Sequence, residues 1–95
     1  MPTYFVVNDT VTDSDALAGY VRAAGPTLVP FGAKVLVHTS EVETVEGQPA
    51  GARMVIIEFA DRAAFDGWYN SPDYQAILTD RLRATQGFGV VVEGR

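Results

Sequence analysis

Residues 53–81, RMVIIEFADRAAFDGWYNSPDYQAILTDR, decide the fold of this chain. Residues 53–59 are mostly apolar and rich in β-branched side chains, which is typical of a buried strand. Residues 62–69 carry apolar side chains on one helical face. Ser71 and Pro72 then begin a second helix, because serine caps helices and proline suits their first position. The stretch therefore predicts a strand, a short helix, a break and a second helix.

The rest of the sequence predicts three more strands and one more helix. Short runs of aromatic and β-branched residues are typical of strands. They occupy residues 3–8 (TYFVVN), 33–39 (AKVLVHT) and 88–93 (FGVVVE). Between the first two runs, apolar residues recur at helical spacing, which predicts a helix before the second strand.

Several residues mark the expected ends of these elements. Thr12 is a suitable N-cap for the first helix, and Gly25-Pro26 is expected to interrupt it. Gly87 is expected to end the last helix, since glycine commonly follows a helical C-terminus. The acidic residues 40–46 could extend the second strand before the glycine-rich turn that closes a hairpin.

The order strand, helix, strand, strand, helix pair, strand is that of the ferredoxin-like, split βαβ fold of the α+β class. Right-handed crossovers in both halves give an antiparallel sheet with strand order 4-1-3-2 and helices on one face. The chain has 95 residues, which suits a single domain spanning residues 1–95.

The predicted strands are apolar on both faces. Alternation in the third strand places Val55 and Ile57 on one face, and Met54 and Glu58 on the other. A sheet with one face in water should alternate more cleanly between apolar and polar side chains. We therefore expect a second copy of the chain to cover the helix-free face, forming a homodimer with twofold symmetry.

Composition narrows the classes of partner and location. The net charge of −5 disfavours nucleic acids and anionic membranes, because both attract basic surfaces. The chain has no cysteine, so disulfides and zinc–thiolate sites are excluded and a reducing compartment is allowed. The first residues do not resemble a signal peptide, and no apolar run approaches the length of a membrane helix. We expect a cytoplasmic protein that binds neither nucleic acid nor membrane.

Nothing in the sequence indicates a cofactor or a metal ion. No G-x-G-x-x-G or G-x-x-x-x-G-K-[ST] segment occurs, so a nucleotide site has no support. His38 is the only histidine, and the carboxylates lack the spacing of known metal ligands. We therefore expect no cofactor and no metal.

Three segments carry a resemblance to a known family. They read ETVEG from Glu43, RMVIIEF from Arg53 and WYNSPDYQ from Trp68. This series is similar to the bacterial family called domain of unknown function 1330, whose usual pattern is E-V-x-E-G, R-x-V-[IV]-[IL]-E-F and W-Y-x-S-P-E-Y-Q. The match extends over nearly the whole chain.

The resemblance implies a ferredoxin-like fold of the dimeric α/β-barrel group. That group includes cofactor-free monooxygenases, muconolactone isomerases and haem-binding proteins. It implies the same homodimer but supplies no activity. Family members often have Arg-Gly-Gly after the second strand, where this chain has His38-Thr39-Ser40. The role of that arginine is either lost here or taken by His38.

Two residues are the candidate catalytic groups. Glu58 is a carboxylate inside an apolar strand, where burial disfavours the charged form and suits a general acid or base. If the hairpin pairs Glu46 near Ala52, His38 becomes a diagonal neighbour of Glu58 on the same face. The two could then move a proton near neutral pH. A satisfied structural carboxylate and an exposed strand-end histidine are the alternatives.

Five further residues are candidate ligand contacts. Three of them have a structural alternative as well: a salt bridge to Glu43 or Glu46 for the arginine, helix packing for the tryptophan, and backbone hydrogen bonds for the amide. These residues are Asn8, Arg53, Met54, Trp68 and Tyr69.

The sequence supports more than one function. We expect a small-molecule pocket in a homodimer, serving an acid/base isomerase or a cofactor-independent monooxygenase with an apolar or aromatic substrate. The alternative is a non-catalytic module that binds a small ligand or serves only as a structural dimer.

Overall fold

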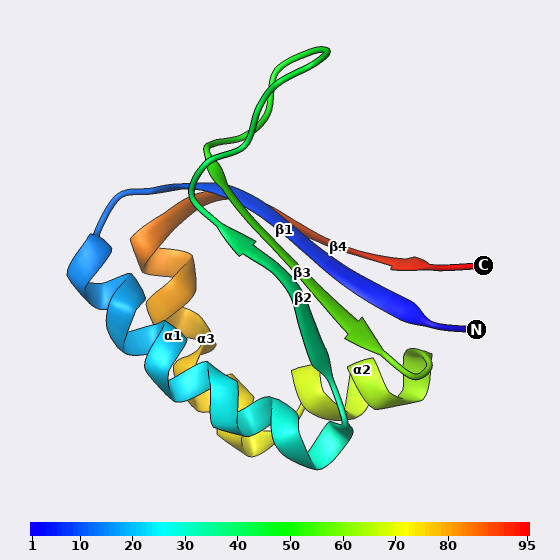
Figure 1. The fold of residues 1–95 in the computed structure, drawn as a ribbon. Coiled ribbons are helices and arrows are strands. Elements are labelled where there is room, and N and C mark those ends of the chain that lie inside the picture. Colours follow the sequence, from blue (N-terminus) through cyan, green and yellow to red (C-terminus); the bar gives the residue numbers. More distant parts are fainter.

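The computed structural model describes residues 1–95 as a four-stranded sheet with its helices on one face (Figure 1). In chain order the elements are β1 (Thr3–Val11), α1 (Ser14–Leu28), the 3-10 turn η1 (Val29–Phe31), β2 (Lys34–Thr39), β3 (Arg53–Phe59), α2 (Arg62–Tyr69), α3 (Pro72–Ala84) and β4 (Thr85–Glu93). The sheet order is β2-β3-β1-β4, and every neighbouring pair is antiparallel. The ferredoxin-like α+β fold and the predicted strand order are therefore confirmed.

The inner face of the sheet packs against the helices and forms the core. Along β3, residues alternate between buried and half-buried from Arg53 to Phe59, as the sequence predicted. Phe59, Trp68 and Tyr74 are all nearly or fully buried, at 0%, 1% and 0% exposure. The rings of Trp68 and Tyr74 have centroids only 3.9 Å apart. This aromatic cluster joins α2 and α3 to the sheet.

The first helix differs from the prediction at both ends. Asp13, not Thr12, is the N-cap, and its side chain accepts a hydrogen bond from the backbone N–H of Ala16. The helix also continues through Pro26 to Leu28. Proline removes only one backbone hydrogen bond there, in the last turn. Burial of Leu28, which is 6% exposed, outweighs that loss.

The ends of two strands also differ from the prediction. Residues 40–46 do not extend β2, which ends at Thr39, and the segment projects from the sheet (Figure 1). Gly87 does not end a helix but lies inside β4, opposite Asp9. A β-carbon at Gly87 would lie 2.2 Å from the carbonyl oxygen of Asn8. This glycine therefore permits close approach of β4 to β1.

The outer face of the sheet carries no helix and is largely apolar. Cross-strand partners share a face, so Tyr4, Val6 and Ile56 lie on it with their neighbours on β4. Phe88, Val90 and Val92 are 49%, 45% and 47% exposed. No helix of the chain has the length and apolar character needed to cross a bilayer.

Candidate functional site

A cavity of about 120 Å³ lies between the inner face of the sheet and α1. Ten of its 14 lining residues are hydrophobic. Its sheet side is lined by Phe5 and Val7 from β1 and by Val55 and Ile57 from β3. Tyr20, Val21, Ala24 and Leu28 line its α1 side, and Trp68 contributes from α2. The cavity is thus built on rigid elements that also form the core.

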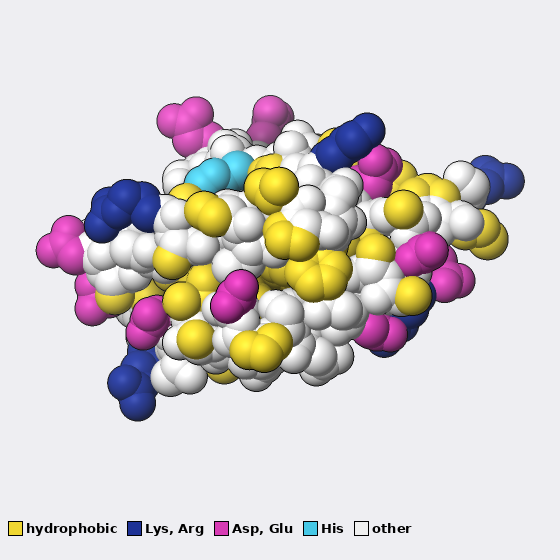
Figure 2. All heavy atoms as spheres, turned by 90° about the horizontal axis from the view of Figure 1, so that it is seen from below, with side chains coloured by type: hydrophobic (Ala, Val, Ile, Leu, Met, Phe, Trp, Pro, Cys, Tyr) yellow, Lys and Arg dark blue, Asp and Glu magenta, His cyan; other side chains and the backbone are white.

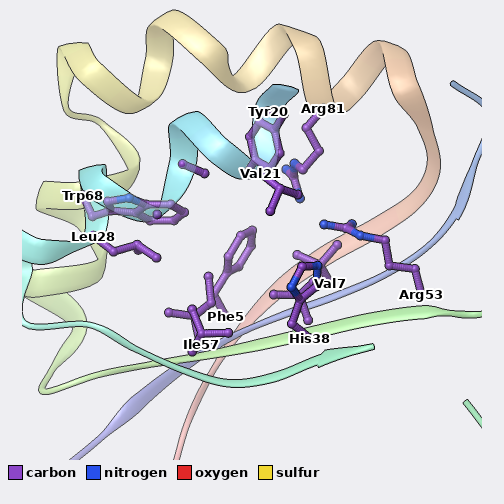
Figure 3. Close-up of a pocket in the computed structure, with 14 residues that line it drawn as sticks. Phe5, Val7, Tyr20, Val21, Leu28, His38, Arg53, Ile57, Trp68 and Arg81 are labelled. Atoms are coloured by element: carbon purple, nitrogen blue, oxygen red, sulfur yellow. The ribbon is translucent and has the colours of Figure 1, made fainter. Parts of the chain in front are cut away.

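The cavity has a polar end and an apolar end. Figure 3 shows the guanidinium groups of Arg53 and Arg81 near the ring of His38, with Trp68 and Leu28 at the other end. The three polar residues come from β3, α3 and β2 respectively. Such a division suits a ligand with one charged or polar group and an apolar body.

Arg53 forms a buried ion pair across the two central strands. Its Nη1 lies 2.8 Å from Oδ2 of Asp9, and the two side chains are 6% and 3% exposed. Asp9 lies directly opposite Arg53 in the β1–β3 register. The salt-bridge alternative for Arg53 is therefore present, but Asp9 is the partner in place of the expected Glu43 or Glu46. Nε of Arg53 and Oδ1 of Asp9 have no hydrogen-bond partner.

Arg81 is a second buried arginine at the same end. It is 7% exposed, and its Nε has no hydrogen-bond partner. The chain has two ion pairs, Arg53–Asp9 and Arg62–Asp66, and Arg81 belongs to neither. Its guanidinium lies over the ring of Phe5, with Cζ 5.6 Å from the ring centroid. The buried cluster of Arg53, Asp9 and Arg81 therefore carries a net charge of +1.

Tyr20, which lines the cavity, shares a hydrogen bond with the buried Tyr74. The oxygens of Tyr20 and Tyr74 are 2.7 Å apart and hydrogen-bonded. Burial raises the pKa of Tyr20, and the Tyr74 hydrogen bond and the positive charge of Arg81 act against that rise. Burial also raises the pKa of Tyr74, again opposed by Arg81. Both hydroxyls therefore remain protonated at neutral pH.

His38 and Glu58 do not meet, and the predicted pairing between them is wrong. Lys34 lies opposite Glu58, so the hairpin pairs in a different register from the predicted one and His38 is four residues beyond that pair. A bulge between Val35 and Val37 then shifts the register by one residue, which places His38 opposite Val55 and facing the cavity. A single inserted residue moves the side chains that follow it to the other face.

Glu58 and Met54 lie on the outer face of the sheet. The hydroxyl of Tyr4 donates a hydrogen bond of 3.2 Å to Oε2 of Glu58. Partial burial and the nearby carboxylate raise the pKa of Tyr4. Met54 is half-buried opposite Asn8. Neither Glu58 nor Met54 borders the sheet–helix cavity.

Asn8 holds the loop that precedes β3 through hydrogen bonds to its backbone. Its Nδ2 donates to the carbonyl oxygens of Gly51 and Arg53 at 3.0 and 2.8 Å. Its Oδ1 accepts from the backbone N–H of Ala50 at 2.8 Å. Both ends of the amide are thus engaged with backbone, which matches the structural alternative for this residue.

Asn8→Ala is expected to lower the free energy of unfolding by about 2–3 kcal/mol, because it leaves three backbone groups without partners. Urea denaturation of the two proteins gives the difference. Thr10→Val removes an exposed hydrogen bond to the same loop and should cost less than about 1 kcal/mol. Equal losses in both variants would contradict a special role for the Asn8 amide.

The two aromatic candidates have different positions. Trp68 borders the cavity, and its Nε1 donates to Oγ1 of Thr27 at 2.9 Å. Tyr69 is half-buried and stacks on Phe65, with ring centroids 5.6 Å apart. It borders a separate, more polar hollow of about 470 Å³ along β4, which Arg81 also reaches. Trp68 is thus both core and cavity wall, whereas Tyr69 lies outside the cavity.

His38 lies where the cavity opens at the molecular surface. Figure 2 shows this single histidine beside a group of hydrophobic side chains. His38 is exposed on the edge strand β2, as is Val35, which also borders the cavity. A ligand could therefore reach His38 without a large change of the fold.

Three residues of the site were not predicted from the sequence: Arg81, Tyr20 and Asp9. A basic residue near the C-terminal end of a helix is commonly a surface charge, because the helix dipole favours cations there. The position of Arg81 is three residues after Leu78 and seven after Tyr74, which places it on the buried face of α3. That spacing is the signal in the sequence that Arg81 is buried.

No cluster of three or more acidic or histidine side chains could hold a metal ion.

The chain matches the sequence model of a known protein family over nearly its whole length. The profile of the domain of unknown function (DUF1330) matches residues 2–95. The chain belongs to the DUF1330 family. The family resemblance stated from the sequence is therefore confirmed. No curated protein matches the sequence.

Solved structures share the fold of this DUF1330 chain at low identity. A protein of unknown function from Rhodopseudomonas palustris is 19% identical, with a TM-score of 0.82 over 99% of this chain and 82% of that one. SnoaB, a cofactor-independent oxygenase from Streptomyces nogalater, is 15% identical, with a TM-score of 0.71 over 99% and 93%. A dabb family protein from Mesorhizobium loti with a ferredoxin-like fold is 17% identical, with a TM-score of 0.67 over 99% and 97%. These similarities support the fold.

Proposed function

We propose that this protein is an enzyme that moves a proton on a small apolar or aromatic substrate held between the sheet and α1. The observation that carries this proposal is the position of His38 at the polar end of an otherwise apolar cavity. Histidine is the side chain best suited to exchange a proton near neutral pH. The outcome is either isomerisation or a cofactor-independent oxidation, the activity named for SnoaB, which shares the fold.

The charge of the cavity fits this chemistry. Removing a proton from a carbon leaves negative charge on the substrate, and the buried cluster next to His38 has a net positive charge. Fixed charges in a dry site stabilise developing charge more strongly than they would in water. The imidazole would act as the base, and the net positive charge beside it would draw a negatively charged ligand into the cavity.

His38→Gln is expected to lower the rate of proton exchange by about 100-fold or more, because general acid–base groups contribute rate factors of that size. The measurement is NMR-detected deuterium uptake by a panel of small carbon acids, run with an oxygen electrode. Oxygen consumption separates oxidation from isomerisation. Glu58→Gln is the control, since Glu58 lies on the outer face.

The control also decides between two locations for the chemistry. Loss of exchange in Glu58→Gln, with His38→Gln unaffected, would move the reaction to the outer face and overturn the proposal. A non-catalytic binding protein is the second candidate, favoured by the hydrogen bond that already engages Glu58 with Tyr4. That candidate predicts ligand binding without exchange in the wild-type protein.

The outer face supports a proposed homodimer. Phe88, Val90 and Val92 expose nearly half of their surface on a face that no element of the chain covers. A contiguous apolar surface of this kind marks an interface. Two copies joined through their sheets would bury it and leave both sheet–helix cavities accessible.

Val90→Arg is expected to convert the dimer into a monomer, because it places a charge in the apolar interface. Light scattering after size exclusion should give twice the chain mass of 10.2 kDa for the wild type and 10.2 kDa for the variant. Val29→Arg changes a side chain that is 76% exposed on η1, away from the sheet, and should remain dimeric. A monomeric wild type would contradict the homodimer.

A further inference from the structure

Arg81 points to the chemical class of the substrate. Its guanidinium is buried at the polar end of the cavity, where its Nε has no partner and no carboxylate pairs with it. We infer that the substrate is a small apolar carboxylic acid bound in its ionised form, with Arg81 as the group that binds its carboxylate. This inference rests on the proposed function and names the substrate of the same cavity.

The charge balance of the buried cluster favours an anion. Asp9 neutralises Arg53 through a 2.8 Å contact, which leaves the charge of Arg81 uncompensated. A buried charge without a partner is strongly unfavourable. The contact with the Phe5 ring, at 5.6 Å, offsets only part of that penalty. An incoming anion would supply the missing partner through the terminal nitrogens of the guanidinium, which are not among the fully buried atoms.

The shape of the donor group and the cavity narrow the anion to an organic carboxylate. A guanidinium presents a planar fork of N–H donors that matches the two oxygens of a carboxylate. The cavity of about 120 Å³ is somewhat smaller than an engineered cavity of about 150 Å³ that holds benzene. Its far end, at Trp68 and Leu28, is apolar. A short hydrocarbon chain with one carboxylate fits this space, and a single ring with a carboxylate would extend toward the open side at His38 and Val35.

Matched pairs of probes test the inference by calorimetry and NMR. The pairs are benzoate with benzamide, and butyrate with butyramide, because each amide keeps the shape and removes the charge. Inorganic phosphate is the third probe, since it carries charge without an apolar body. The wild type should bind each carboxylate about tenfold or more tightly than its amide, because hydrogen bonds to charged groups are the stronger ones.

Variants assign the effect to Arg81. Arg81→Met should remove the preference for carboxylates, whereas Arg81→Lys should retain part of it, because a lysine keeps the charge but not the fork. Arg83→Met is the matched control on the same helix, since Arg83 is exposed and borders none of the described cavities. Circular dichroism of each variant establishes that it is folded.

The outcomes separate this inference from the proposed function. Equal affinity for benzoate and benzamide, an unchanged preference in Arg81→Met, or phosphate binding as tight as benzoate would each overturn the inference. His38→Gln should lose proton exchange while keeping benzoate affinity within about threefold. If that variant keeps full exchange, the proposed function fails even where carboxylate binding is observed.

Discussion

Asp9→Asn is expected to lower the free energy of unfolding by about 3–5 kcal/mol, the usual loss when one partner of a buried ion pair is removed. The side chains of Asp9 and Arg53 are 3% and 6% exposed. Water therefore cannot solvate the guanidinium of Arg53 once the negative charge of Asp9 is removed. Arg53 and Arg81 would then be two buried cations at the same end of one cavity. Urea denaturation at neutral pH measures the change.

An exposed ion pair of the same kind provides the control. Arg62 and Asp66 lie 3.0 Å apart on α2, with side chains 54% and 51% exposed. Asp66→Asn should therefore cost less than about 1 kcal/mol. In the double variant Asp9→Asn/Arg53→Met, removal of the unpaired guanidinium should recover much of the loss. A small effect of Asp9→Asn alone would show that the pair does not hold β1 to β3.

The fold was predictable because its signals are local and repeated. Alternation in residues 53–59 and the helical start at Ser71 each fix an element with little help from tertiary contacts. The errors occurred where tertiary packing outweighs local preference. Pro26 remains helical because Leu28 reaches the core, and Gly87 lies in a strand because β1 approaches it closely. Neither contact is visible in the sequence nearby.

The site was less predictable because it depends on the register in which β3 pairs with β2 and β1. One bulge between Val35 and Val37 decides which face His38 occupies, and no residue type in that segment requires a bulge. The partner of Arg53 was equally hidden, since Asp9 is 44 residues away in the chain. Pairing across a sheet of this kind is set by the fold as a whole.

The sheet separates two sets of candidate residues, which clarifies what each could do. His38, Arg53 and Trp68 border the cavity on the inner face. Glu58 and Met54 lie on the outer face, where the proposed dimer would form. Chemistry at the cavity and assembly through the sheet therefore use opposite faces, and variants of one face need not disturb the other.

Arg81→Met is expected to raise the free energy of unfolding of the ligand-free protein by about 1–4 kcal/mol, the range seen when buried ion pairs are replaced by apolar residues of similar size. Methionine fills much of the space of the arginine stem and removes a charge whose Nε has no partner. Most core substitutions destabilise proteins, so a gain would be unusual. Chemical denaturation without ligand gives the value.

A gain in stability would indicate that the arginine is kept for a purpose other than folding, as functional sites often are. Arg83→Met, on the exposed side of the same helix, should change stability by less than about 0.5 kcal/mol. Adding benzoate should stabilise the wild type and leave Arg81→Met unchanged, because only a native state that binds the ligand gains from it. If Arg81→Met destabilises the ligand-free protein by several kcal/mol, the guanidinium is a structural group, and the case for an anionic substrate loses its foundation.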